Sequence, residues 1–317
     1  MKARLFAVLA VALLVAVVSR SPSVIGETAI ALTTAVSPFS TRVDVVDGRN
    51  VSSLDASATH DEGAPLVLLH GLYSRKEVWL PVGNALSFRR RVAIPDLPHM
   101  LEDFSPRRTA ELLLRWADER SLDRFHVAGS SFGGAVAVHL ADLAPDRVLS
   151  VSLLGAPFGI VPPADASLAS SSARERLLKV APRASFLPGA LAFLADEPPR
   201  PHDDGTWKAL VASDASRDLP GVIARLSQKV QLVWCREDAV FPLADLDALN
   251  VPHVDVSVAN ECGHALHVEA PKRARYYLKF FLGQIERGRR WPISYPPAGD
   301  PRFDHERPLA SIRNTLS

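Results

Sequence analysis

The order of apolar and polar positions along the chain predicts short strands separated by helices. Short apolar runs, which are typical of buried strands, occur at residues 66–69, 92–94, 125–128, 148–154, 230–234 and 254–258. Apolar side chains recur with the 3.6-residue period of a helix in three further stretches, at 105–119, 132–143 and 271–286. Alternating strands and helices favour an α/β fold, with a mostly parallel sheet covered by helices on both faces.

Turn residues near the start of this region predict a β-hairpin. Val43 and Val45 precede Asp47-Gly48, and Val51 follows it. Asp-Gly tolerates the positive φ angles of a tight hairpin turn. We therefore expect two antiparallel strands to open the sheet, and the folded domain to span residues 42–286.

Two other segments do not follow the alternation. Residues 158–228 contain no convincing strand and are dominated by Pro, Ala, Ser and charged residues, which predicts an insertion in the form of a small helical cap. The tail, residues 287–317, is rich in Pro and Arg and has few apolar residues. We expect it to wrap the surface or to stay mobile.

The first residues have the pattern of a targeting segment. Lys2 and Arg4 precede an unbroken apolar run from Leu5 to Val18, and Arg20 ends it. A membrane-spanning helix needs roughly 20 apolar residues, so this shorter run is more typical of a signal peptide. We expect residues 1–20 to direct export, to the periplasm or the medium, or to stay uncleaved as a membrane anchor. Residues 21–41, punctuated by Ser, Thr and Pro, are expected to be a linker outside the fold.

Composition narrows the classes of partner. Hydrophobic residues make up 47% of the 317 positions, which is ample for a buried core. The formal net charge of +1 provides no broad basic field, so no nucleic-acid partner is expected. The sequence has no His-Glu-x-x-His, no Cys-x-x-Cys and no phosphate-binding loop motif, so neither a metal nor a cofactor is expected.

The strongest chemical signal is Gly129-Ser130-Ser131-Phe132-Gly133, which lies between a predicted strand and a predicted helix. In that setting Gly-x-Ser-x-Gly is typical of a nucleophile elbow, a sharp turn that exposes the serine hydroxyl. Gly129 and Gly133 permit the tight turn. Only Ser131 fits the register, because Ser130 has no glycine two residues before it. The alternative is an ordinary glycine-rich turn between a strand and a helix.

A serine hydroxyl is a poor nucleophile unless a base and a group that orients this base lie within reach. Asp238 follows the predicted strand at 230–234, and His264 follows the one at 254–258. We predict that Ser131 is the nucleophile, that His264 is the general base and that Asp238 orients the histidine.

These segments resemble the signature blocks of the α/β-hydrolase superfamily, and the likeness extends over roughly residues 42–286. It rests on His70-Gly71, 129–134, 234–242 and 263–269. The resemblance implies a catalytic triad of Ser131, Asp238 and His264. Glu237 is the second candidate for the acid, one position out of register. His267 corresponds to a companion histidine that is more often structural than catalytic.

An acyl-transfer enzyme also needs two backbone N–H groups to stabilise the oxyanion. Phe132, directly after the nucleophile, is the first candidate donor. The resemblance implies Leu72 as the second, in the loop that His70 and Gly71 open. His70 is either a residue that orients this loop or an ordinary turn histidine.

Cys235 and Cys262 are the only cysteines, and they follow two strands that should be neighbours. A disulfide there is compatible with an oxidising compartment. We expect two inert buried thiols instead.

The residues favour an esterase or lipase that acts on a small-molecule ester or lipid, with membrane association through the N-terminus. The same triad serves a carbon–carbon bond hydrolase or an acyltransferase, which are the alternatives. A catalytically dead fold that acts as a binding module is the alternative outside enzymes. Apolar residues of the predicted cap, such as Phe186 and Leu191, favour medium-chain acyl esters.

Overall fold

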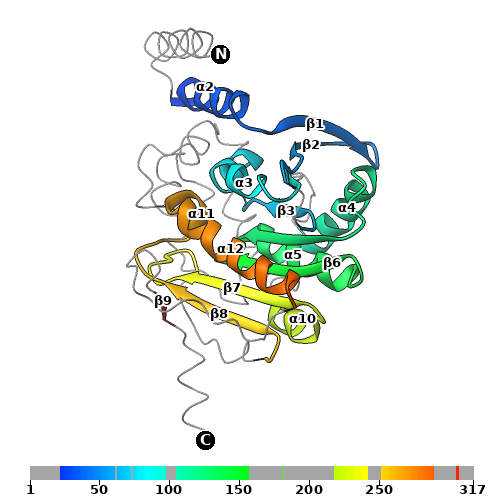
Figure 1. Ribbon diagram of the computed structural model, residues 1–317, viewed down its shortest axis with the longest axis vertical. Helices are drawn as coiled ribbons and strands as arrows, with labels where there is room; N and C mark the ends of the chain where they lie inside the picture. Colours follow the sequence, from blue (N-terminus) through cyan, green and yellow to red (C-terminus); the bar gives the residue numbers. More distant parts are fainter. Residues whose placement is uncertain are drawn as a thin grey trace, which may run out of the picture.

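The fold is a twisted mixed sheet with helices on both faces (Figure 1). The computed structural model describes residues 22–60, 63–72, 74–97, 105–156, 181, 218–241, 251–288 and 305–306. Within this part of the chain the sheet has nine strands in the order β1-β2-β4-β3-β5-β6-β7-β8-β9. Their bounds are β1 Ser40–Val46, β2 Arg49–Ala56, β3 Leu66–Leu69, β4 Val92–Pro95, β5 Phe125–Ser130, β6 Val148–Leu154, β7 Lys229–Cys235, β8 Val254–Ala259 and β9 His305–Glu306.

The strands from β4 to β8 pair in parallel, and only β1, β2 and β9 are antiparallel to their neighbours. This arrangement confirms the predicted α/β class. The central strands β3, β4 and β5 are buried along their whole length, as their apolar composition predicts. The predicted hairpin is also present, since β1 and β2 pair in antiparallel fashion. Asp47 and Gly48 form its turn, with positive φ angles of 49° and 73°.

Two helical layers enclose the sheet. The helices α4 (Pro106–Glu119), α5 (Phe132–Leu143) and α10 (Leu219–Arg225) pack together on one face. The 3₁₀ helix η1 (Lys76–Trp79) and the helices α3 (Leu80–Leu86), α11 (Leu266–Glu269) and α12 (Pro271–Glu286) pack together on the other, where α12 crosses in front of the strands in Figure 1. The buried residues of α12 recur with the spacing of an amphipathic helix: Ala274, Tyr277, Leu278, Phe281 and Leu282.

Residues 21–41 were expected to be a linker outside the fold, and this expectation is wrong for the described residues. They include the helix α2 (Pro22–Ala35), and two of their side chains are buried against the body. Ile30 and Phe39 are buried, and the Phe39 ring packs against Gly83 of α3. Pro22 is the first residue of the helix, where its missing N–H costs no hydrogen bond. Proline is therefore compatible with a helix start here. The predicted leader, residues 1–20, lies outside the described residues.

The predicted cap and tail each meet the body at one described segment. Residues 219–225, at the end of the predicted insertion, form α10, which packs on α5 with Leu219, Val222 and Ile223 buried. This part of the insertion belongs to the body. Apart from Ala181, residues 157–217 lie outside the described part of the chain, so the cap stays a prediction. In the tail, β9 extends the sheet beyond β8.

None of the helices within the described residues combines the length and the apolar character needed to cross a membrane.

Candidate active site

Ser131 occupies a sharp turn between β5 and α5. Its φ of 53° lies in the left-handed region that residues other than glycine rarely adopt. The Ser131 N–H donates to the carbonyl oxygen of Leu154 at the end of β6, at 3.1 Å. A Cβ on Gly129 would collide with the backbone of Gly133, and one on Gly133 would collide with the carbonyl oxygen of Leu69. The turn therefore requires both glycines, as a nucleophile elbow does.

Asp238 and His264 form a buried pair. The His264 Nδ1 lies 2.8 Å from Asp238 Oδ2, and the second carboxylate oxygen accepts from the N–H groups of Val240 at 2.9 Å and Phe241 at 2.8 Å. Because a carboxylate can only accept, Nδ1 carries the proton and donates it. The His264 Nε2 is buried and has no hydrogen-bond partner among the described atoms. It is therefore the ring nitrogen available to accept a proton.

The elbow and this pair meet at the end of β6. A Cβ on Gly155, which has a φ of 59°, would lie 2.9 Å from the His264 carbonyl oxygen, 3.2 Å from its Nδ1 and 3.3 Å from Asp238 Oδ2. The preceding residue, Leu154, holds the Ser131 N–H. The three predicted triad residues thus gather around the Leu154-Gly155 peptide, at the carboxyl ends of parallel strands where α/β sheets place their ligand sites.

The predicted oxyanion loop reaches the serine through Gly71. A Cβ on Gly71 would lie 3.2 Å from the Ser131 Cβ and 3.7 Å from its Oγ, so glycine leaves the space beside the hydroxyl open. Leu72 follows Gly71 and is buried, and Phe132 is the buried first residue of α5. The assignment of their N–H groups to an oxyanion hole stays a prediction.

His70 ties the loop after β3 to the end of β4. Its side chain is fully buried, and its Nε2 accepts a hydrogen bond from the N–H of Leu97 at 2.9 Å. Nδ1 therefore carries the proton, and it donates to the Gly71 carbonyl oxygen at 2.8 Å. These contacts favour the interpretation of His70 as a residue that orients the loop.

Charged residues that the sequence reasoning missed support the same loop. Lys76 Nζ binds Asp96 Oδ2, and it lies 3.1 Å from Glu77 Oε1. Burial would lower the pKa of Lys76, but the two carboxylates outweigh it and raise the pKa. Burial likewise would raise the pKa of Asp96, but His70 and Lys76 outweigh it and hold the pKa below its usual value. The sequence contains one signal for this cluster, because the acidic residue Asp96 directly follows the buried strand β4.

His267 is a structural residue rather than a second base. Its ring is completely buried and stacks on Trp79, with centroids 4.2 Å apart. Burial, with smaller contributions from His264 and His70, lowers the pKa of His267 to about 3. The ring is therefore neutral at physiological pH.

The loops that carry Asp238 and His264 are joined by a disulfide between Cys235 and Cys262, whose Cα atoms are 5.3 Å apart. Our expectation of two free thiols is wrong. The strands β7 and β8 pair Cys235 with Ala259, and the backbone then turns at Glu261, with a φ of 54°, so that Cys262 lies over Cys235.

Glu237, the second candidate for the acid, binds the backbone of the loop before His264. Its carboxylate accepts from the N–H groups of Glu261 at 3.2 Å and Cys262 at 3.0 Å. Glu269 accepts from Gly263 N at 2.8 Å in the same way. Both glutamates hold the loop that precedes His264, whereas Asp238 binds the histidine itself.

The described residues contain no group of three or more His, Cys, Asp or Glu side chains able to hold a metal ion.

Comparison with known proteins defines the class. Residues 66–274 match the model of the alpha/beta hydrolase family, and the chain belongs to this family. Its distant relatives include lipases, esterases and an acetyltransferase.

Two related sequences and one solved structure illustrate the range of proteins that this chain resembles. The dihydrolipoyllysine-residue acetyltransferase component of the acetoin cleaving system of Pseudomonas putida is 30% identical over 238 residues, which cover 69% of this chain and 64% of that protein. A monoacylglycerol lipase of Xenopus laevis is 22% identical over 258 residues, covering 70% of this chain and 76% of the lipase. The crystal structure of a bacterial membrane phospholipase A matches with a TM-score of 0.65 at 21% identity, over 90% of this chain and 99% of that one. At this identity the structural likeness shows the fold alone.

Proposed function

We propose that the protein is a serine carboxylesterase that works through an acyl-enzyme on Ser131. The observation that carries the proposal is the buried Asp238–His264 pair beside a serine on a strained elbow. This arrangement supplies a nucleophile, a base with a free ring nitrogen and a carboxylate that orients the base.

In the first half of the proposed reaction, the Ser131 Oγ attacks the ester carbonyl carbon and His264 Nε2 takes the hydroxyl proton. The N–H groups of Phe132 and Leu72 stabilise the negative oxygen of the tetrahedral intermediate. Asp238 stabilises the imidazolium. When the intermediate collapses, His264 gives its proton to the departing alcohol, and the acyl group stays on Ser131.

In the second half, a water molecule replaces the alcohol. His264 takes a proton from the water as the water attacks the acyl-enzyme, and the ester bond to Ser131 breaks. The proton returns to the Ser131 oxygen, and a carboxylic acid leaves. No metal or cofactor takes part in this sequence of steps.

The substrate we propose is a lipid or another ester with a medium-length acyl chain. Relatives named as lipases support this class. Each buried methylene of an acyl chain gains about 0.8 kcal/mol. The predicted cap residues that would contact the chain lie outside the described residues. Hydrolysis rates on p-nitrophenyl esters should therefore rise with acyl length and then fall, whereas a rate that only falls would contradict the lipid proposal.

We also propose that the protein is exported or anchored to a membrane. The apolar run from Leu5 to Val18 and the Cys235–Cys262 disulfide both support a location outside the reducing cytoplasm. Cell fractionation tests this, and finding the full-length protein in the cytosol with reduced cysteines would contradict it.

Labelling with a fluorophosphonate tests the enzyme proposal directly, because only an activated serine reacts. The protein should label, and its Ser131→Ala variant should not. An intact protein that fails to label would favour the binding module. Cleavage of a vinylogous diketone without any ester hydrolysis would favour the carbon–carbon hydrolase, and acyl transfer to an added alcohol or thiol in preference to water would favour the acyltransferase.

A further inference from the structure

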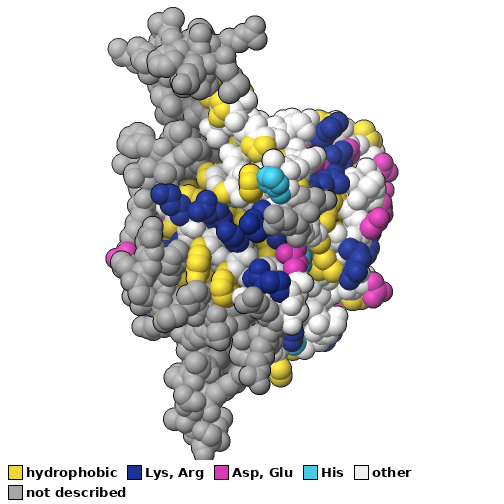
Figure 2. All heavy atoms as spheres, in the orientation of Figure 1, with side chains coloured by type: hydrophobic (Ala, Val, Ile, Leu, Met, Phe, Trp, Pro, Cys, Tyr) yellow, Lys and Arg dark blue, Asp and Glu magenta, His cyan; other side chains and the backbone are white. Residues whose placement is uncertain are grey.

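A groove of about 670 Å³ lies between α3 and α12, on the face of the molecule that Figure 2 presents. Its apolar lining comes from Ala85, Leu86, Phe88, Ala270, Pro271 and Tyr276. The Phe88 side chain is 52% exposed, which is unusual for a large aromatic residue. In volume and lining the groove falls within the range of small-molecule sites.

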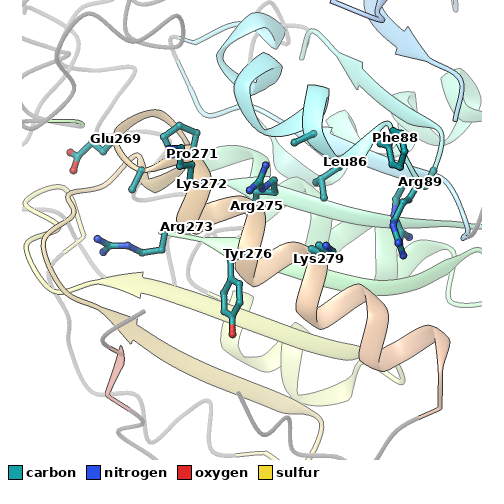
Figure 3. Close-up of a pocket in the computed structure, with 13 residues that line it drawn as sticks. Leu86, Phe88, Arg89, Glu269, Pro271, Lys272, Arg273, Arg275, Tyr276 and Lys279 are labelled. Atoms are coloured by element: carbon teal, nitrogen blue, oxygen red, sulfur yellow. The ribbon is translucent and has the colours of Figure 1, made fainter. Parts of the chain in front are cut away.

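Cationic side chains border this apolar lining. Lys272, Arg275 and Lys279 recur at the spacing of one helix face, and all three are exposed along α12. Figure 3 shows Arg275 extending from α12 toward Leu86 of α3. Arg89 and Phe88 lie together at the other end of the groove in the same view. Figure 2 shows the resulting band of Lys and Arg side chains.

Among the described residues, these three cations of α12 have no ion-pair partner. No described carboxylate lies within 4 Å of Lys272, Arg275 or Lys279. Two further cations that line the groove have partners: Arg90, in the segment before β4, forms a bidentate pair with Glu286, at 2.7 and 3.0 Å, and Arg273 of α12 donates to the Asn260 carbonyl oxygen. Among the described residues that line the groove, Glu269 is the only one with a carboxylate, and it accepts from Gly263 N.

We infer that this groove binds a single-chain anionic amphiphile, such as a fatty carboxylate, at a site separate from Ser131. The apolar lining contacts the hydrocarbon chain, and Lys272, Arg275 and Lys279 neutralise the head group. Neither feature alone selects this ligand. An apolar groove without the cations would take a neutral lipid equally well, and exposed cations without the groove would attract any anion weakly. Their combination favours a molecule with an anionic head and an apolar chain.

The test measures direct binding of a fluorescent 12-carbon carboxylate below its micelle concentration, by anisotropy, to protein whose Ser131 has been blocked with a fluorophosphonate. Protein with the Ser131→Ala substitution replaces the blocked form if no label attaches, so that the groove is tested even where the esterase proposal fails. The groove variant reverses the charge of the three cations of α12 with the substitutions Lys272→Glu, Arg275→Glu and Lys279→Glu. The matched control reverses three exposed cations elsewhere, Arg42→Glu, Arg49→Glu and Arg124→Glu. Thermal unfolding verifies that both variants fold.

We expect the groove variant to lose affinity by about tenfold or more and the control variant by less than about twofold, since three weak exposed contacts add to roughly one order of magnitude. The 12-carbon alcohol and acetate should each bind much more weakly than the carboxylate, and salt should weaken carboxylate binding. Equal binding of the alcohol, or equal losses in the two variants, would overturn the inference. Binding to phosphatidylglycerol vesicles that depends on the groove cations, without binding of the free carboxylate, would also overturn it and assign the face to a membrane surface.

Discussion

The edge of the sheet that carries the candidate active site and the groove between α3 and α12 use charge in opposite ways. At the edge, Asp238 and His264 are buried, and both carboxylate oxygens of Asp238 are hydrogen-bonded within the protein. In the groove, Lys272, Arg275 and Lys279 are exposed, with no carboxylate partner among the described residues. A buried charge must be paired inside the fold, whereas an exposed charge is stabilised by water. The edge is therefore arranged before any ligand arrives, whereas in our inference the exposed cations of the groove exchange water for an anionic ligand.

Preorganisation is what acyl transfer requires, because donors and dipoles that are already in place cost nothing to reorient during the reaction. The disulfide and the hydrogen bonds of Glu237 and Glu269 hold the loop before His264 in place, as the proposed reaction requires. The predictions below test how strongly the edge depends on its fixed contacts, in order of expected effect.

Replacing Ser131 by alanine should lower ester turnover by at least about 10⁴-fold, because it removes the nucleophile on which the proposed acyl-enzyme forms. The matched control is Ser130→Ala, which deletes the neighbouring buried hydroxyl of β5. Its turnover should stay within about tenfold of the wild type. An active Ser131→Ala variant beside an inactive Ser130→Ala variant would show that the register of the elbow is wrong.

Asp238→Asn should lower kcat by about 10³- to 10⁴-fold, because an amide no longer stabilises the imidazolium of His264 and can impose the wrong tautomer. Steady-state kinetics on a p-nitrophenyl ester measures the loss. Glu237→Gln is the control, since its remaining carbonyl oxygen still accepts a hydrogen bond from the loop before His264. A larger loss in Glu237→Gln than in Asp238→Asn would assign the acid to Glu237.

Removing the disulfide with Cys235→Ser and Cys262→Ser should lower the free energy of unfolding by about 2 to 4 kcal/mol. Urea unfolding with and without a reductant measures this. The reductant should destabilise the wild type and leave the double variant unchanged. If the reductant has no effect on the wild type, the two cysteines are already thiols in the protein.

Glu286, the partner of the groove residue Arg90, provides a pH test of a paired charge. Burial would raise its pKa, but the nearby His126 and the hydrogen-bonded Arg90 outweigh it and lower the pKa to about 2. Because the pKa falls on folding, this stabilisation is present above the usual value of 4.5 and is lost as the pH falls toward about 2. Glu286→Gln should therefore cost about 2 kcal/mol at pH 7 and much less at pH 2.

Urea unfolding of the wild type and the Glu286→Gln variant at both pH values measures the difference. A cost that does not change with pH would show that the carboxylate contributes by packing rather than by charge. Lys279→Gln is the control on the same helix. It should change the free energy of unfolding by less than about 0.5 kcal/mol at either pH, because no described acid pairs with Lys279.

Local patterns in the sequence determined the elements that hold the site. The strands at 66–69 and 148–154 and the helices at 132–143 and 271–286 have the bounds that the apolar spacing predicts. The candidate residues Ser131, Asp238 and His264 followed from a short motif and from the order of residues after strands. Such features depend on neighbours a few residues away, so they can be read without knowledge of the fold.

Only the tertiary structure decided which distant residues meet. The disulfide depends on the register of β7 and β8 and on the turn at Glu261. The segment that contains α2 packs on the body because Ile30 of the helix and Phe39 after it are buried there. The Ser, Thr and Pro residues of this segment had favoured a linker. The groove exists because α12 lies beside α3, almost two hundred residues away in the sequence. Burial and long-range pairing are properties of the packed chain, and no local pattern encodes them.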